Sequence, residues 1–254
     1  MFVSKSYPMK ISATGLLLAA CIISLMSISN SSRANAGTVP DRKSITTFSS
    51  INSFSAIYAN KVYQNIIQKG YDLSEDVFNM AFKGFEKLSS VGRLNSDSLL
   101  TIIDFTKSSR EKRMFVVDLK SMQVVFNTVV SHGMNSGAEY ARHFSNKMNS
   151  HQSSLGFYVT GEPYKGSNGY SLKLDGVEQG FNDKAMDRAI VIHGAPYANE
   201  RIIQVKGYLG RSHGCPALPQ QLSKHVINSI KQGNLVFVYY PDQKYLKESE
   251  ILNG

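Results

Sequence analysis

Residues 210–219 read GRSHGCPALP and hold the most informative side chain of the sequence, that of Cys215. The chain has one other cysteine, Cys21, near its N-terminus. A structural cysteine is more typical of an apolar strand or helix, whereas Cys215 lies in a polar, turn-forming stretch between a glycine and a proline. His213 precedes it by two positions, and in extended backbone such side chains share a face. The stretch therefore raises the question whether Cys215 reacts or is buried and inert.

A cysteine nucleophile needs a base and donors for the oxyanion. Because a free thiol has a pKa of about 8.5, a neighbouring imidazole must make or keep the thiolate. His193 is a candidate base, since it ends the apolar stretch RAIVI (188–192), and Gly214 permits a tight turn that exposes N–H groups. The structural alternatives are a strand-end histidine bonded to backbone and an ordinary glycine turn. Zinc held by His193, His213 and Cys215 is a further alternative, although the sequence has no HExxH arrangement.

The N-terminus predicts export. Two lysines precede an apolar, uncharged run over residues 11–28, and Ala-Asn-Ala at 34–36 has the form of a signal peptidase site. We therefore predict a signal peptide over 1–36, cleaved after Ala36, and a protein of the periplasm or cell envelope. The alternatives are a lipoprotein anchored at Cys21, where Leu-Ala-Ala-Cys forms a lipobox, and an uncleaved membrane anchor.

Charge and composition narrow the function classes. The chain carries 28 basic and 19 acidic residues, a formal net charge of +9, and the predicted signal peptide removes three basic and no acidic residues, leaving 9 − 3 = +6. Without clustered basic runs this charge is that of an ordinary soluble surface, and export argues against a nucleic-acid partner. After cleavage Cys215 is the sole cysteine, so no intramolecular disulfide is expected.

Two helices are expected before the cysteine-bearing region. Residues 37–50 are small and polar and predict a linker, 51–68 have apolar side chains on a helical period, and Ser74 opens a second helix. Together they give a linker and helical hairpin over 37–96. The aromatic side chains along its helices are expected to pack in the core rather than to bind a ligand. The apolar side expected for the first helix is Phe54, Ile57, Tyr58, Val62 and Ile66.

The remaining residues, 97–254, predict a mainly β domain, an antiparallel sandwich or barrel with one flanking helix. The reason is a series of short β-rich stretches separated by turn residues. The strands are expected over 98–106, 114–121, 123–133, 157–164, 170–178, 188–195 and 235–241, and the helix over 218–233.

His193-Gly194, with SHGC at 212–215, resembles the signature of the L,D-transpeptidase (YkuD-type) catalytic domain. The stretches VVSHGMNSG, SSLGFYVTGEPY and LDGVEQGFND extend the resemblance to the murein L,D-transpeptidase subgroup, over about residues 97–241. Pro216-Ala217 depart from the family pattern, in which a hydrophobic residue and then Asn or Arg commonly follow the cysteine. The departure bears on the substrate more than on the nucleophile.

The resemblance implies roles for the matching residues. Cys215 would be the nucleophile, and His193 the base, oriented by the backbone carbonyl of Gly194. His213 would support the thiolate, and backbone N–H groups of the loop would form the oxyanion hole. The loop residues concerned are Ser212, His213, Gly214 and Cys215.

Four further residues are candidates for binding substrate. Arg211 and Arg188 are suited to a stem-peptide carboxylate, because a guanidinium binds one bidentately, and surface charge is the alternative for both. Ser131 and His132 are candidates for lining the cleft, although a strand-ending turn explains them equally.

The reaction that the resemblance implies is acyl transfer on peptidoglycan, without a metal or cofactor. Cys215 would attack the bond between the third stem residue and D-Ala, release D-Ala, and pass the thioester to an amine of another stem. The implied partners are peptidoglycan stem peptides or a wall-anchored protein, with membrane contact only through an uncleaved or lipidated N-terminus. Family members are typically acylated by carbapenems. The alternatives are hydrolysis of the same acyl-enzyme, as an L,D-carboxypeptidase or an amidase releasing wall-linked protein, and a wall-binding module with an inert cysteine.

Overall fold

The computed structural model describes residues 42–95 and 99–254, with side chains from residue 54 onward. Residues 46–254 form one compact unit. Its strands are β1 (Leu99–Asp104), β2 (Met114–Asp118), β3 (Gln123–Thr128), β4 (Gly156–Gly166), β5 (Gly169–Gly176), β6 (Val191–Ala195), β7 (Ala217–Pro219) and β8 (Leu235–Tyr239). The helices are α1 (Arg42–Gln68), α2 (Glu75–Ser90), α3 (Glu200–Lys206), α4 (Gln220–Ile230), α5 (Gln243–Glu248) and α6 (Glu250–Asn253), with a 3-10 turn at Met134–Ser136.

The predicted signal peptide and its anchored alternatives lie outside the described residues. Within the described ranges, no helix is both long enough and apolar enough to cross a membrane.

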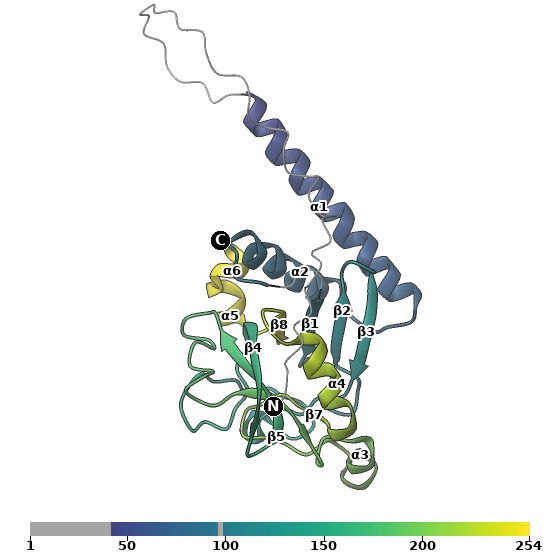
Figure 1. The fold of residues 1–254 in the computed structure, drawn as a ribbon, viewed down its shortest axis with the longest axis vertical. Helices are drawn as coiled ribbons and strands as arrows, with labels where there is room; N and C mark the ends of the chain where they lie inside the picture. The colour runs from purple at the N-terminus through teal and green to yellow at the C-terminus, as the bar shows by residue number, and fades with distance from the viewer. Residues whose placement is uncertain (1–41, 96–98) are drawn as a thin grey trace, which may run out of the picture. The chain divides into compact units, whose positions relative to one another are not determined.

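All eight strands belong to one sheet, in the order β3-β2-β1-β8-β4-β5-β6-β7 (Figure 1). The last strand in sequence, β8, is a central one, because it pairs with β1 on one side and β4 on the other. The β1–β8 and β6–β7 pairs are parallel, whereas the other pairs are antiparallel. The sheet is therefore mixed, whereas the sequence predicted a purely antiparallel one.

The two ends of the sheet approach each other. Beyond β3, Ser131 forms an antiparallel bridge with Ala217 of β7, and its N–H donates to the Ala217 carbonyl at 2.8 Å. A second bridge joins Gly133 to Ser212. These contacts nearly close the sheet into a barrel, which confirms the predicted fold class, and they bring the chain after β3 beside the cysteine loop.

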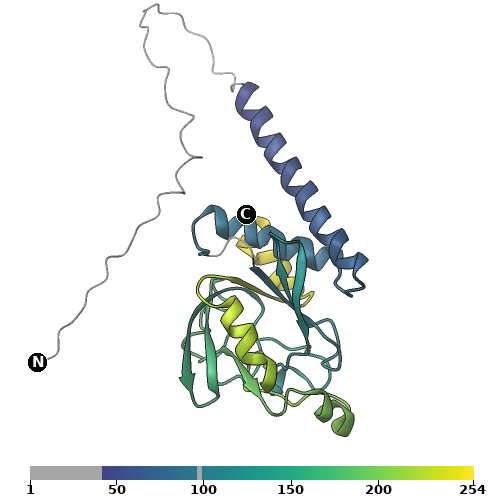
Figure 2. The same ribbon diagram turned by 45° about the vertical axis from the view of Figure 1, so that its right-hand side comes forward.

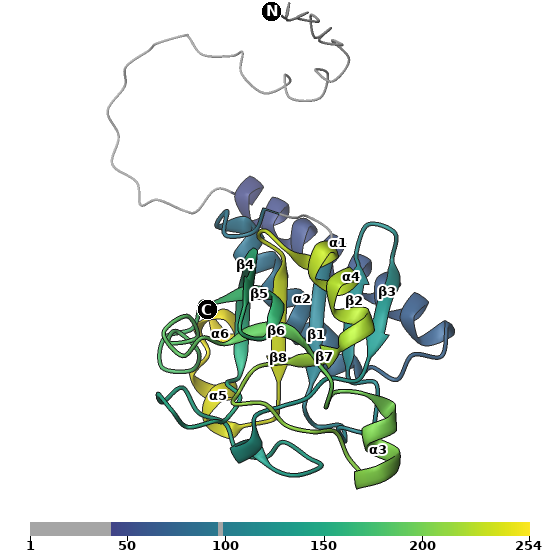
Figure 3. The same ribbon diagram turned by 60° about the horizontal axis from the view of Figure 1, so that its bottom comes forward.

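Helices cover the two faces of the sheet, with α4 on the near side and α2 behind it in Figure 3. On α2, Gly84 leaves room for the Phe157 ring of β4, which stacks on Phe237 of β8 with ring centroids 4.2 Å apart. On the other side, a Cβ at Gly194 would lie 2.4 Å from the Ser223 hydroxyl of α4. This close approach of α4 fixes the position of β6, the strand that carries His193.

The first helix differs most from its prediction. It begins at Arg42 rather than at residue 51, inside the stretch predicted as a linker. Val62 and Ile66 are buried as expected, but Phe54 and Ile57 are 73% and 67% exposed. These two side chains have helical spacing but are not buried. The second helix, α2, follows its prediction closely, with Ser74 at the N-cap.

A buried carboxyl ties the C-terminal helices to the sheet. Glu178 accepts hydrogen bonds from the Phe157 N–H at 2.8 Å, from the Tyr245 hydroxyl of α5 at 2.9 Å, and from the Ser249 hydroxyl before α6. Burial raises the pKa of Glu178, and these donors oppose the rise. The short helices α5 and α6, absent from the sequence prediction, are thus held at the end of the unit away from α3 (Figure 2).

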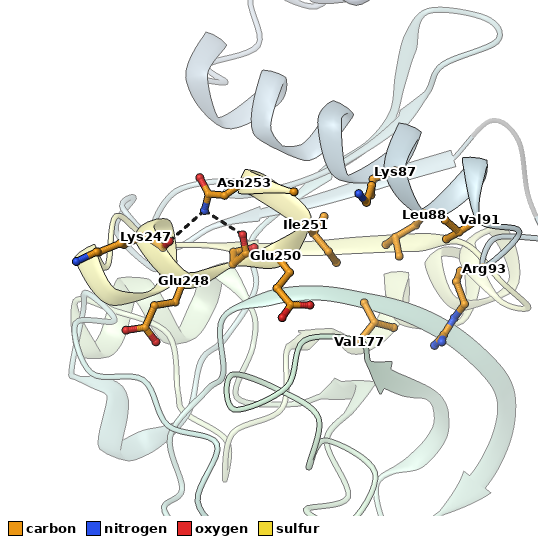
Figure 4. A pocket seen from close by; sticks show the side chains of 12 residues that line it. Lys87, Leu88, Val91, Arg93, Val177, Lys247, Glu248, Glu250, Ile251 and Asn253 are labelled. Carbon is orange, nitrogen blue, oxygen red and sulfur yellow. Dashed lines mark hydrogen bonds between the residues drawn. The ribbon is translucent and has the colours of Figure 1, made fainter. Parts of the chain in front are cut away.

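A pocket of about 710 Å³ lies beside these helices, between α6 and the end of α2 (Figure 4). None of the site residues predicted from the sequence lines it. Its walls are formed by Lys87, Leu88, Val91, Arg93, Val177, Lys247, Glu248, Ser249, Glu250, Ile251, Asn253 and Gly254.

Candidate active site

Strand register brings Cys215 and His193 onto the same part of the sheet. His193 of β6 pairs with Ala217 of β7 in parallel register, and Cys215 lies two residues before Ala217, in the loop that leads into β7. The Val191 backbone, two residues before His193, is among the groups that act on the Cys215 thiol, and it lowers the thiol pKa. Alternate residues of a strand point to one face, so His193 is the next side chain on the face of Val191.

The His193 ring has a defined tautomer. Its Nδ1 lies 3.0 Å from the Gly194 carbonyl, which can only accept, so Nδ1 carries the proton and Nε2 is the basic nitrogen. The residue is 4% exposed, and burial lowers the pKa of its imidazole below the usual 6.5. At neutral pH the ring is therefore uncharged and able to accept a proton, as a general base requires.

The Cys215 thiol is also enclosed, with 7% of the residue exposed. Burial raises its pKa above the usual 9.0, while the Val191 N–H and the Arg188 charge oppose the rise. These directions make the resting pair a neutral thiol and a neutral imidazole at neutral pH. Proton transfer to His193 would then accompany attack on a substrate rather than precede it.

The loop before β7 is shaped by its own hydrogen bonds. The Ser212 hydroxyl donates to the Cys215 carbonyl at 2.6 Å and accepts from the Gly214 N–H at 3.1 Å. The Gly214 N–H, expected in the oxyanion hole, is therefore already engaged. The N–H groups of His213 and Cys215 remain as candidates for that role, and Ser212 acts by holding the loop.

In this loop, Gly214 is the position where a side chain is hardest to accommodate. Its φ is +125°, and an added Cβ would lie 2.8 Å from the Gln152 carbonyl oxygen and 2.9 Å from Ile190 Cδ1. Backbone strain of this kind costs about 1–3 kcal/mol, and the close contacts add to it. Gly214→Ala should therefore lower the free energy of unfolding by at least that amount, as measured by chemical denaturation.

A matched control for this variant is Gly207→Ala. Gly207 also has positive φ, +82°, but nothing lies within 4 Å of its added Cβ. It should lose less stability than Gly214→Ala. Equal losses in the two variants would contradict the contribution of the close approach to Gln152 and Ile190.

The ring of His213 packs against a second histidine. It is exposed, and it stacks on His151 with ring centroids 4.4 Å apart and an angle of 7° between the planes. No group of three potential metal ligands of the types His, Cys, Asp and Glu occurs among the described residues. The alternative zinc site of His193, His213 and Cys215 is thus not assembled.

Ser131 and His132 lie in the interior. They are 0% and 1% exposed, so they belong to the core beside the barrel closure rather than to an open cleft. Nδ1 of His132 accepts a hydrogen bond from Nη2 of Arg113 at 2.8 Å, and its Nε2 lies 3.3 Å from the Gly137 carbonyl. Burial, and next the charge of Arg113, lower the pKa of His132 to about 3, so the ring is neutral and structural.

The two arginines suggested for a substrate carboxylate differ. The described contacts of Arg211 use only Nη1, which lies 3.1 Å from the Gly137 carbonyl, and its guanidinium carbon lies 5.8 Å from the centre of the Tyr208 ring. It remains suited to a carboxylate. Both terminal nitrogens of Arg188 are instead bonded to oxygens of residues 145–154, and its binding of a substrate carboxylate stays a prediction.

The sequence analysis missed Tyr197, which lies between β6 and α3. Burial, and next the negative charge of the Cys215 thiolate, raise the pKa of its phenol to about 12. The ring packs on Gly210, where a Cβ would lie 2.4 Å from Tyr197 Cβ. Its only signal in the sequence was its position four residues after His193, which no rule of spacing singles out.

Comparison with known proteins gives one family. Residues 69–239 match the L,D-transpeptidase catalytic domain family. A search of curated proteins found no match.

Solved structures with a similar arrangement share little sequence with the chain. An L,D-transpeptidase from Mycobacterium smegmatis has a TM-score of 0.36 and 13% identity, covering 56% of this chain and 59% of its own. One from Stackebrandtia nassauensis has a TM-score of 0.35 and 16% identity, covering 67% and 68%. A third, solved in complex with imipenem, has a TM-score of 0.36 and 14% identity, and the chain spans 60% of its length.

Proposed function

Because the chain belongs to the L,D-transpeptidase catalytic domain family, we propose that it is an exported acyltransferase that modifies peptidoglycan stem peptides through Cys215. The observation that carries the proposal is the β6–β7 register, which pairs His193 with Ala217, two residues after Cys215. A nucleophile with an adjacent neutral base is the arrangement that acyl transfer requires.

The proposed first step forms a thioester. Nε2 of His193 takes the thiol proton as the Cys215 sulfur attacks the carbonyl between the third stem residue and D-Ala. The oxyanion is stabilised by loop N–H groups, for which His213 and Cys215 are the candidates. The peptide bond then breaks, and the proton held by His193 passes to the leaving amine of D-Ala.

The proposed second step restores the thiol. An amine of an acceptor stem attacks the thioester carbonyl and loses a proton to His193, and the Cys215 sulfur leaves and takes that proton back. The products are a new amide bond and free enzyme. Arg211 is proposed to bind a stem carboxylate, because most of its guanidinium is not engaged in the contacts described for it.

Defined tetrapeptide muropeptides test this proposal. The protein beginning at residue 37 is incubated with them, a Cys215→Ala variant serves as control, and products are identified by mass spectrometry. We expect a cross-linked dimer and free D-Ala with the wild type and neither with the variant. Release of D-Ala without a dimer would replace transpeptidation by hydrolysis, and identical unchanged substrate in both samples would contradict a catalytic role for Cys215.

A further inference from the structure

The guanidinium of Arg188 is surrounded by neutral oxygens of one loop. Nη1 donates to the Ser145 carbonyl at 2.7 Å and to the Ser154 hydroxyl. Nη2 donates to the Gln152 carbonyl at 2.6 Å and to the Ser150 hydroxyl at 3.2 Å. One side chain thus holds both ends and the middle of the loop formed by residues 145–154.

The positive charge of Arg188 has no carboxylate partner in the described part of the chain. None of the ion pairs found there includes Arg188, and the side chain is partly buried. A buried charge is costly unless an opposite charge faces it. The acidic groups that interact with this guanidinium are Tyr158 and Cys215, and the buried Tyr158 phenol has its pKa raised, which keeps it neutral. When Cys215 ionises during the reaction, its thiolate is therefore the anion that Arg188 balances.

The loop that Arg188 holds also contacts the nucleophile loop. The Ser153 hydroxyl donates to the Gly214 carbonyl at 3.1 Å, and the His151 ring stacks on His213. A Cβ at Gly214 would lie 3.3 Å from Nη2 of Arg188, so the guanidinium itself lies against the backbone next to Cys215.

The backbone around this contact is strained. Asn149, His151 and Ala189 have positive φ values of 56°, 54° and 53°. The Ala189 carbonyl, next to Arg188 in the chain, accepts a hydrogen bond from the Cys215 thiol, with 3.6 Å between oxygen and sulfur. Strained conformations at non-glycine residues persist only where surrounding contacts enforce them, and they concentrate at functional sites.

We propose that Arg188 is a positioning residue that fixes residues 145–154 against the nucleophile loop and provides the fixed positive charge that favours ionisation of Cys215. The inference rests on the proposed function, in which Cys215 is the nucleophile. It replaces substrate binding, the role that the sequence suggested for this arginine.

The other polar groups around Cys215 cannot supply this charge. Burial lowers the pKa of His193, which is neutral at pH 7, and the Tyr197 phenol has its pKa raised to about 12 and is neutral too. The ring of His213, in the nucleophile loop itself, packs on His151. Arg188 therefore carries the one fixed charge among the groups found to act on the pKa of Cys215 in the described chain.

The experiment measures the rate of Cys215 alkylation by iodoacetamide as a function of pH. The variants are Arg188→Met, which removes the charge, and Arg188→Lys, which keeps it and loses most of the loop contacts. We expect the midpoint of the Arg188→Met profile to rise by about one pH unit or more, which is about tenfold less thiolate below both midpoints. Arg188→Lys should keep its midpoint closer to the wild type while its melting temperature falls.

Two controls make the outcome specific. Arg142→Met removes an exposed arginine from the preceding segment and should leave the midpoint unchanged, and Cys215→Ala identifies the labelled site. An unchanged midpoint in Arg188→Met, or an equal change of rate at every pH, would overturn the charge role. If Arg188→Met does not fold, a midpoint shift in Arg188→Lys as large as one pH unit would overturn it instead. If the alkylation midpoints of the Arg188 variants shift as expected but the wild type leaves muropeptides unchanged, the proposed function is contradicted. The role of Arg188 in the ionisation of Cys215 would still stand.

Discussion

Replacing His193 with alanine should lower the turnover of muropeptides by about 10²–10⁴-fold, the contribution of a positioned general base. The reason is that the thiol of Cys215 has a pKa raised by burial and needs a proton acceptor at the moment of attack. The measurement is the initial rate of D-Ala release by the wild type and by His193→Ala.

The pH profile of the same reaction gives an independent check. Because burial lowers the pKa of His193 below 6.5, the base stays neutral down to a lower pH than a free histidine does. The acid limb of kcat/KM should therefore have its midpoint below pH 6.5. His225→Ala, an exposed histidine of α4, should retain full activity. Activity of His193→Ala within a few-fold of the wild type would make His213 the better candidate for the base.

Replacing Arg113 with methionine should lower the free energy of unfolding by about 1–3 kcal/mol for each buried acceptor that is left without a donor. Arg113 is 0% exposed, and it donates to the Val130 carbonyl, to the Lys107 carbonyl and to His132. Methionine fills much of the space but leaves these acceptors without donors. Urea denaturation of the two proteins gives the difference directly.

A surface arginine and a pH series complete this test. Arg110→Met, at an exposed position, should change stability by less than about 0.5 kcal/mol. The pKa of His132 is about 3 in the folded protein, against 6.5 for the free side chain, so unfolding takes up a proton between these values. The stability due to a neutral His132 is complete above pH 6.5 and is lost as the pH falls toward 3. A His132→Gln variant with the same pH dependence as the wild type would contradict this.

Local patterns allowed much of the fold to be predicted. The β2–β3 hairpin, the strands β4 and β5 and the amphipathic helix α2 follow from alternation or helical period over a few residues. Cys215 and His193 were identified because a motif with fixed spacing carries them. These features depend on neighbours in sequence, which a reader of the sequence can see.

The remaining features depend on contacts between distant parts of the chain. The parallel β1–β8 pair joins strands more than 130 positions apart, as its register of Leu100 with Leu235 shows. The contacts of Arg188 depend on acceptors at residues 145–154, about 35 to 45 positions away. A buried arginine such as Arg113 looks like any surface arginine until its carbonyl partners are known. Hydrophobic periodicity and amino-acid composition do not report contacts between residues that are distant in sequence.

The central place of β8 sets a condition on when the enzyme can become active. In the strand order of the sheet, β8 (Leu235–Tyr239) is the strand that joins β1–β3 to β4–β7. A growing polypeptide therefore has no complete barrel until that last strand has been synthesised, and pairings of such long separation form slowly. The bridge between Ser131 and Ala217, which seats the nucleophile loop, depends on both halves being in place. The loop that carries Cys215 therefore takes its final position only once residues 235–239 have joined the sheet.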